Sequence, residues 1–284
     1  METNTKTENQ SATIFTANPL IRKLSKISES SENHVTRKGV SNKCIYYAIT
    51  IGIGVALAFL MQAIGPAVNL SNIVINESFE INVAALTVAG MTGLIIAFFV
   101  FLITPFLAFL IRKSIPVTGA LYCASTGYIY AYLALLLDEY KNAVILAVLV
   151  TIVVCISMFL LYRTGIIKVT QKFRAVMVTL LVASVIISLI TLVCCFIPVP
   201  ALRAIPDMFY GNGVLGIVFS VIGVLIAAMF LLSDFAVVDN AIETQLPKEY
   251  EWYCAYSLAF SVIWLFLKIL DLVIKILGKS SSSH

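Results

Sequence analysis

Long apolar segments separated by short polar ones make up the chain after residue 43. Seven such segments follow one another, at 44–63, 81–111, 115–137, 142–162, 175–197, 213–233 and 255–277. A helix of about 20 apolar residues spans a hydrocarbon core of roughly 30 Å, and it satisfies its own backbone hydrogen bonds, which lipid cannot do. The pattern therefore predicts an all-α polytopic membrane protein with seven transmembrane helices.

Residues 1–43 have a different character and predict a flexible, basic N-terminal arm. Within the arm, the stretch 18–29 places apolar residues on one helical face with basic residues beside them. This pattern fits either a short amphipathic helix on an anionic membrane surface or a transient helix in a tail. The remainder, 44–279, predicts a single seven-helix transmembrane domain.

Composition and charge agree with this class and add an orientation. The chain is 60% hydrophobic and only 12% charged, whereas a soluble domain is about a quarter charged. With the N-terminus inside, the inner segments carry 14 Lys and Arg residues, and the outer loops carry only Lys141 and Arg203. The excess of positive charge predicts a cytoplasmic N-terminus. Seven spans would then place the C-terminus outside, although Lys275 and Lys279 argue against that, so a re-entrant or tilted last segment remains open.

Residue types that perform catalysis are sparse. The chain has only two histidines, His34 and His284, and it contains no HExxH, GxSxG or CxxC motif. A GxGxxG match at 211–216 opens an apolar segment, whereas a dinucleotide site needs this turn between a strand and a helix. The sequence therefore predicts no enzyme, no resident cofactor and no nucleic-acid partner, with the lipid bilayer as the obligatory surrounding.

The candidate functional residues are carboxylates near the last two apolar segments. Asp234, Asp239 and Glu243 follow a charge-free run at 208–233. They either mark the point where a helix leaves the membrane or form a site for a proton or a cation, because ionisable groups at membrane depth face protein or water. Asp271 lies inside the last segment, where Lys268 shares its helical face and is a possible ion-pair partner.

Four stretches of the sequence carry a family resemblance. The segment LLSDFAVVDNAIETQLPKEYEWYCAYSLAFSVIWLFLKIL at 231–270 closely resembles the end of bacterial YccA-type members of the Bax inhibitor family. NPLIRKLSK, PVTGALYCASTGYIYAYLA and YRTGIIKVTQKFR resemble that family at matching places, so the resemblance covers nearly the whole chain. It implies six helices around a central seventh, a multi-pass protein of the inner (plasma) membrane, and a pH-sensitive calcium leak.

In the family members that leak calcium, the resemblance implies a gate of two aspartates that share a proton. Two close carboxylates cannot both ionise cheaply, so they titrate as a unit, and deprotonation leaves a negative charge that suits a hard divalent cation. Asp234 matches the first aspartate, which leaves Asp239 and Glu243 as cytoplasmic-loop charges. However, Phe260 stands at the position of the second aspartate and Thr126 at that of a third-helix glutamate, and 81–110 lacks the basic latch residue.

The sequence thus favours a pH-influenced cation leak, with Ca²⁺ as the permeant ion and Asp234 as the carboxylate that responds to protons or binds the ion. Asp271, Asp239 and Glu243 are secondary candidates, although Asp271 lies about 16 Å along a helix from Phe260. The alternative is a non-conducting regulator that binds a membrane protease or another membrane protein. The arm 1–43 would be its natural contact surface.

Overall fold

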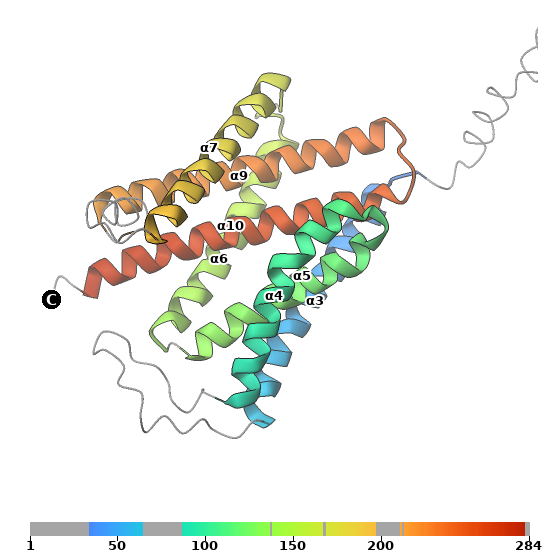
Figure 1. Ribbon diagram of the computed structural model, residues 1–284. Coiled ribbons are helices and arrows are strands. Elements are labelled where there is room, and N and C mark those ends of the chain that lie inside the picture. The colour runs from blue at the N-terminus through green and yellow to red at the C-terminus, as the bar shows by residue number, and fades with distance from the viewer. Residues whose placement is uncertain are drawn as a thin grey trace, which may run out of the picture.

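The computed structural model describes residues 34–64, 87–136, 138–166, 169–196, 211 and 213–281. These residues form helices and no strand, so the all-α class is confirmed (Figure 1). The elements are α3 (Arg37–Ile64), α4 (Val88–Leu110), the 3-10 helix η2 (Arg112–Ser114), α5 (Ile115–Leu136), α6 (Asp138–Arg163), α7 (Gln171–Phe196), α9 (Val214–Glu243) and α10 (Tyr250–Ser281).

Each of the seven predicted apolar segments falls on one of these α-helices. Six helices are long and apolar enough to cross a membrane by length and composition. The remaining one, α7, is 26 residues long and carries the fifth predicted apolar segment. The chain is therefore a polytopic membrane protein.

Several helices extend beyond the predicted apolar segments. The last part of the predicted arm is helical, because α3 begins at Arg37 and the Thr36 hydroxyl accepts a hydrogen bond from the Gly39 amide at 3.0 Å. Helix α9 continues past residue 233 to Glu243, and α10 begins at Tyr250 rather than at residue 255. Hydropathy alone marked only the apolar parts of these helices, which continue through polar residues at their ends. The predicted amphipathic stretch 18–29 lies outside the described residues.

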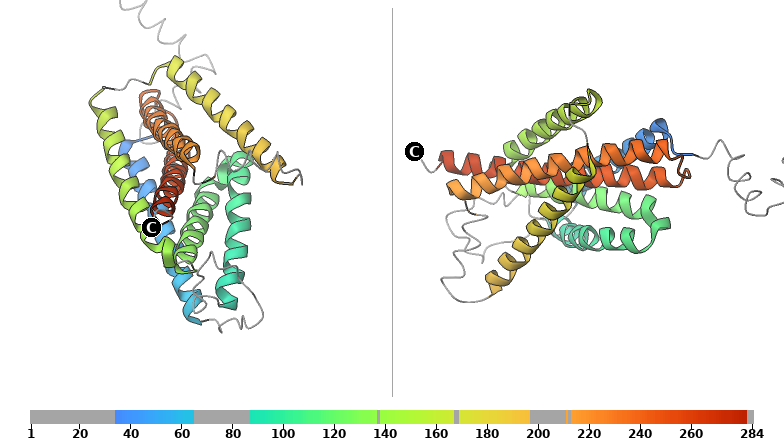
Figure 2. Two further views of the ribbon diagram at one scale, coloured as in Figure 1. Left: turned by 90° about the vertical axis from the view of Figure 1, so that its left-hand side faces the viewer. Right: turned by 90° about the horizontal axis from the view of Figure 1, so that it is seen from above.

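Helices α9 and α10 form a long antiparallel pair that runs through the molecule (Figures 1 and 2). Helix α10 packs against α3, α5 and α6 in addition to α9. Helix α4 packs against α3 and α5, and α7 packs against α9. The last helix therefore packs against four of the other helices, and α4 and α7 pack against helices that contact it.

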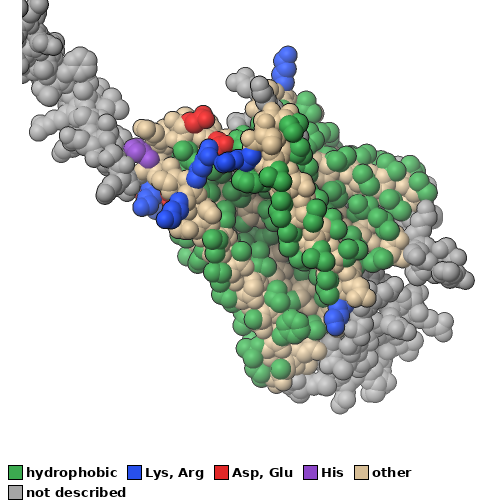
Figure 3. Space-filling view, turned by 180° about the vertical axis from the view of Figure 1, so that it is seen from behind, with side chains coloured by type: hydrophobic (Ala, Val, Ile, Leu, Met, Phe, Trp, Pro, Cys, Tyr) green, Lys and Arg blue, Asp and Glu red, His purple; other side chains and the backbone are tan. Residues whose placement is uncertain are grey.

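The ends of several helices meet at one end of the molecule, which we call the basic end. It comprises the start of α3, the turn between α4 and α5, the end of α6 and the turn between α9 and α10. These segments carry the described basic residues Arg37, Lys38, Lys43, Lys113, Arg163 and Lys248. On the face drawn in Figure 3, hydrophobic side chains cover most of the surface and charged ones gather mainly toward one end. The charge distribution predicts that the basic end faces the cytoplasm.

The crossing of α3 and α5 brings two backbones into close contact. A Cβ at Gly54 would clash with the carbonyl oxygen of Ala124, and a Cβ at Gly127 would clash with the carbonyl oxygen of Ile51. Small residues allow this approach in membranes, where helix association depends on packing rather than on a hydrophobic force. Gly52, only two residues from Gly54, has no heavy atom within 4 Å of its would-be Cβ.

We expect Gly54→Ala to destabilise the protein by about 1–3 kcal/mol, because the added methyl group must push α5 away. The matched control is Gly52→Ala on the same helix, which meets open space and should leave stability unchanged or raise it slightly through helix propensity. Thermal unfolding of both variants in detergent measures the difference. Equal melting temperatures for the two would contradict the close crossing.

Candidate ion-responsive site

Asp234 lies in the interface between α9 and α10, where it is 9% exposed. The Ser257 hydroxyl of α10 donates a hydrogen bond of 2.7 Å to its Oδ1. Its Oδ2 is buried and has no hydrogen-bond partner among the described residues. Ser261, one helical turn beyond Ser257, lies near the same carboxylate but outside hydrogen-bond geometry. The carboxyl group therefore has one satisfied and one unsatisfied oxygen in a buried position.

The position of Asp234 along α9 separates it from the end of that helix. It lies nine residues before Glu243, the last residue of α9, which corresponds to about 14 Å of helix. Leu231 and Leu232 beside it are each 1% exposed. Of the two interpretations left open by the sequence, a helix end and a buried site, the structure supports the buried site for this residue.

Asp239 and Glu243 also belong to α9 rather than to a loop, so the loop assignment was wrong. Asp239 accepts hydrogen bonds from Arg37 at 3.0 Å and from the Tyr162 hydroxyl at 2.7 Å. It therefore connects the end of α9 to α3 and α6, which is a structural role at the basic end. Glu243 is exposed. Neither side chain is a hydrogen-bond partner of Asp234.

Asp271 belongs to a separate polar cluster in the other half of the α9–α10 pair. Its Oδ2 accepts hydrogen bonds from the Ser220 hydroxyl at 2.5 Å and from Lys275 at 3.0 Å. The Lys275 ammonium also donates to the Ser220 oxygen at 2.7 Å, and its side chain is only 4% exposed. Lys275 rather than Lys268 is thus the ion-pair partner of Asp271, so the expected pairing was wrong. The alkyl part of Lys268 lies against Gly223 instead.

The distance between the two polar clusters means that Asp271 does not replace the missing second carboxylate of the gate. Ser257, which contacts Asp234, is 14 residues before Asp271 on α10, or about 21 Å along the helix. Between the clusters lie buried apolar residues of the two helices, among them Ala227, Leu265 and Ile269. Proton sharing between Asp234 and Asp271 is therefore excluded by geometry.

Phe260, at the position of the expected second aspartate, belongs to an aromatic cluster. Its ring stacks on that of Tyr122 with centroids 5.5 Å apart. Thr126, at the position of the expected glutamate, donates a hydrogen bond of 2.7 Å to the Tyr122 carbonyl oxygen. The places that would hold acidic partners are thus filled by an aromatic ring and by a locally satisfied hydroxyl. The polar partner of Asp234 is Ser257, which the sequence reasoning missed although 257 and 261 share a helical face.

A second buried carboxylate that the sequence reasoning missed is Glu251, which is 1% exposed in the first turn of α10. It accepts hydrogen bonds from the amide and the hydroxyl of Thr36, both at 3.0 Å, and it forms an ion pair with Lys43. Gly39 leaves the space that this carboxylate occupies. Glu251 therefore fixes the start of α3 to the start of α10. The burial of Glu251 results from the tertiary contact between α3 and α10, which no local sequence pattern shows.

The neighbouring turn adds backbone contacts to the same junction. The Val35 amide donates to the Leu246 carbonyl oxygen at 2.9 Å, and His34 Nδ1 lies 2.8 Å from the Gln245 carbonyl oxygen. Residues 34–36 thus run alongside the turn between α9 and α10. Among the described residues of the whole chain, no group of three or more His, Cys, Asp or Glu side chains is placed to hold a metal ion.

Comparison with known proteins identifies the family. A family model described as Bax inhibitor 1 like matches residues 3–278, nearly the whole chain. The chain belongs to this family. No curated protein and no solved structure matches it. The resemblance of the four sequence stretches to the Bax inhibitor family is thereby confirmed. In this member of the Bax inhibitor 1-like family, Asp234 has a serine rather than a second acid as its hydrogen-bond partner.

We expect Glu251→Gln to lower the free energy of unfolding by about 3 kcal/mol, because it leaves Lys43 without its charged partner in a largely buried place. Glu249→Gln makes the same chemical change two residues away on an exposed side chain and should leave stability unchanged. Chemical or thermal unfolding in detergent distinguishes them. A Glu251→Gln protein as stable as Glu249→Gln would mean that this ion pair does not hold α3 to α10.

Proposed function

We propose that the protein is a slow, pH-influenced leak for cations, calcium in particular, in the plasma (inner) membrane, and that Asp234 is the group that responds. The observation that carries the proposal is the buried carboxylate between α9 and α10, with Oδ1 bonded to Ser257 and Oδ2 without a partner. An ionised group in such surroundings is costly unless a cation or water compensates it. Whether Asp234 is ionised therefore depends on whether water or a cation enters the α9–α10 interface.

Protons and cations compete for this carboxylate, which gives the pH dependence its direction. When protonated, Asp234 is neutral and compatible with closely packed apolar helices. When ionised, it favours separation of the helices enough to admit water or a cation. We therefore expect the leak to increase as pH rises. Since one carboxyl group titrates here in place of a proton-sharing pair, the dependence should be that of a single site.

The small number of oxygen ligands fits passage of calcium rather than its storage. Ca²⁺ takes six to eight oxygen ligands in its protein sites. Asp234 and Ser257 offer a carboxylate and a hydroxyl, so a passing Ca²⁺ ion would retain most of its water. Weak binding of this kind is what a conducting site requires, because the ion must also leave.

We expect Asp234→Asn to abolish the pH dependence of calcium flux into proteoliposomes between about pH 6 and pH 8, because the amide does not titrate in that range. The matched control is Glu243→Gln, an exposed carboxylate on the same helix, which should keep the wild-type profile. Flux reported by a trapped calcium dye provides the measurement. Identical flux of wild type and Asp234→Asn at every pH would rule out the proposed role.

A specific observation also favours a second candidate, a non-conducting regulator that binds a membrane protease or another membrane protein. Phe260, stacked on Tyr122, removes the second carboxylate on which the proton-sharing gate of the family depends. At the basic end, His34 and Val35 lie against the turn between α9 and α10. Residues 1–33 are thus attached to the chain beside this turn, where a partner would contact arm and turn together.

Deletion of residues 1–30 separates the two candidates. A regulator that acts through its arm should lose its partner, seen as loss of cross-linked co-purification from native membranes. A leak through the α9–α10 interface should keep its calcium flux in proteoliposomes after the same deletion. Retained co-purification would contradict binding through the arm, and lost flux would contradict a leak through the α9–α10 interface.

A further inference from the structure

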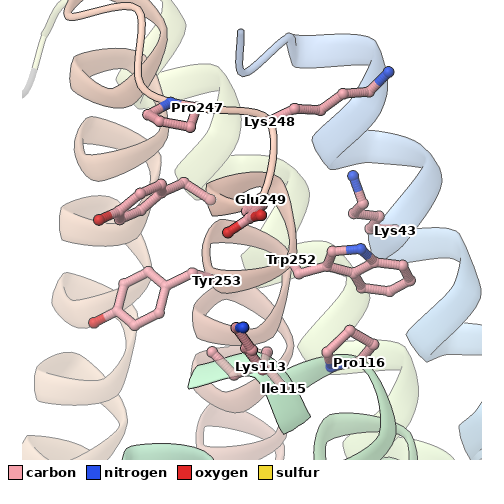
Figure 4. A pocket seen from close by; sticks show the side chains of 10 residues that line it. Lys43, Lys113, Ile115, Pro116, Pro247, Lys248, Glu249, Trp252 and Tyr253 are labelled. Carbon is pink, nitrogen blue, oxygen red and sulfur yellow. The ribbon is translucent and has the colours of Figure 1, made fainter. Parts of the chain in front are cut away.

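A pocket of about 1160 Å³ opens at the basic end, and Asp234 is not among the residues that line it. It lies between the start of α10, the start of α3 and the turn from α4 to α5 (Figure 4). The lining residues are Lys43, Lys113, Ile115, Pro116, Pro247, Lys248, Glu249, Tyr250, Trp252 and Tyr253. Its walls combine basic, aromatic and apolar side chains.

The charges that line the pocket are unevenly balanced. Lys43 is paired with Glu251, and its ammonium lies 5.1 Å from the centre of the Trp252 ring. Lys113 and Lys248 form no ion pair with any described residue, and both side chains are exposed. Glu249 is the one acidic side chain in the lining. Two free ammonium groups against one carboxylate leave a net charge that a single anion neutralises.

The free charges come from different parts of the fold. Lys113 belongs to η2, between α4 and α5, and Lys248 to the turn between α9 and α10. Figure 4 shows Lys248 above and Lys113 below the Trp252 side chain, with Glu249 between them. Lysine side chains have flexible four-carbon stems and bind phosphate as mobile point charges. Both ammonium groups can therefore approach an anion held beside the indole ring.

The remaining walls suit the boundary between headgroups and acyl chains. Trp252, Tyr253 and Tyr250 are among the lining residues, and aromatic residues with a polar edge favour this depth of the membrane. Ile115 and Pro116 provide apolar surface where α5 begins. The pocket thus combines unpaired ammonium groups with aromatic and apolar surface, as a phospholipid combines a charged headgroup with acyl chains.

We propose that this pocket binds an anionic phospholipid of the membrane leaflet at the basic end. Lys113 and Lys248 hold the headgroup phosphate, and Trp252, Ile115 and Pro116 contact the glycerol and the first part of the acyl chains. Basic pockets between helices on the cytoplasmic side recognise headgroups through this chemistry. The proposal concerns a site that Asp234 does not line, and it holds whether or not the protein conducts ions.

Native mass spectrometry of the full chain in detergent tests the proposal, with dioleoylphosphatidylglycerol as the probe and dioleoylphosphatidylcholine as the zwitterionic comparison. We expect one phosphatidylglycerol to bind more tightly than phosphatidylcholine. Lys113→Gln and Lys248→Gln should each weaken its binding about fivefold, the effect of removing one basic residue near an anionic headgroup. Glu249→Gln removes the opposing carboxylate and should strengthen binding by a similar factor. This gain cannot come from misfolding.

Lys38→Gln is the matched control, because Lys38 is an exposed lysine at the same end and does not line the pocket. It should bind phosphatidylglycerol as the wild type does. Three outcomes would overturn the proposal. They are equal weakening by Lys38→Gln and the pocket variants, equal retention of phosphatidylcholine, and complete competition by millimolar inorganic phosphate. The last result would mean that the pocket takes a free phosphate rather than a lipid.

Discussion

A carboxylate between apolar helices is costly unless another group compensates its charge, and this constraint organises the α9–α10 pair. Asp234 of α9 bonds to Ser257 of α10, whereas Asp271 of α10 bonds to Ser220 of α9 and to Lys275 of its own helix. The two contacts with serine each join residues at one depth of the pair. The two clusters fix the register of the long helices, and the apolar layer between them keeps the clusters apart.

Hydrogen-bonded carboxylates also connect α3 and α6 to this pair at the basic end. Glu251 holds the start of α3 through Thr36 and Lys43, and Asp239 holds α3 and α6 through Arg37 and Tyr162. These carboxylates have charged or hydroxyl partners and are therefore satisfied. Asp234 differs from them because one of its oxygens has no partner among the described residues.

Much of the fold follows from hydropathy, since lipid accepts only helices that satisfy their own backbone. The seven apolar segments accordingly fall on seven helices, and the family resemblance of the 231–270 stretch is confirmed over nearly the whole chain. The boundaries of α9 and α10 were misplaced, because their polar ends are supported by contacts from α3 and α6 that no local pattern contains. The ion-pair partner of Asp271 was misplaced for a similar reason. Lys268 and Lys275 are both within reach along the helix, and the presence of Ser220 on α9 favours Lys275.

The sequence by itself determined the class of the protein and where its apolar helices lie, and its family resemblance pointed to Asp234 as the candidate residue. It also determined that Phe260 and Thr126 cannot ionise where acidic partners were expected. Only the tertiary structure decided which side chain meets Asp234, that Glu251 is buried, and that two unpaired lysines gather around Trp252. These facts depend on the rotation and depth of helices distant in the chain. The periodicity of apolar residues shows which face of each helix is buried. It does not show which residue of the neighbouring helix lies against that face.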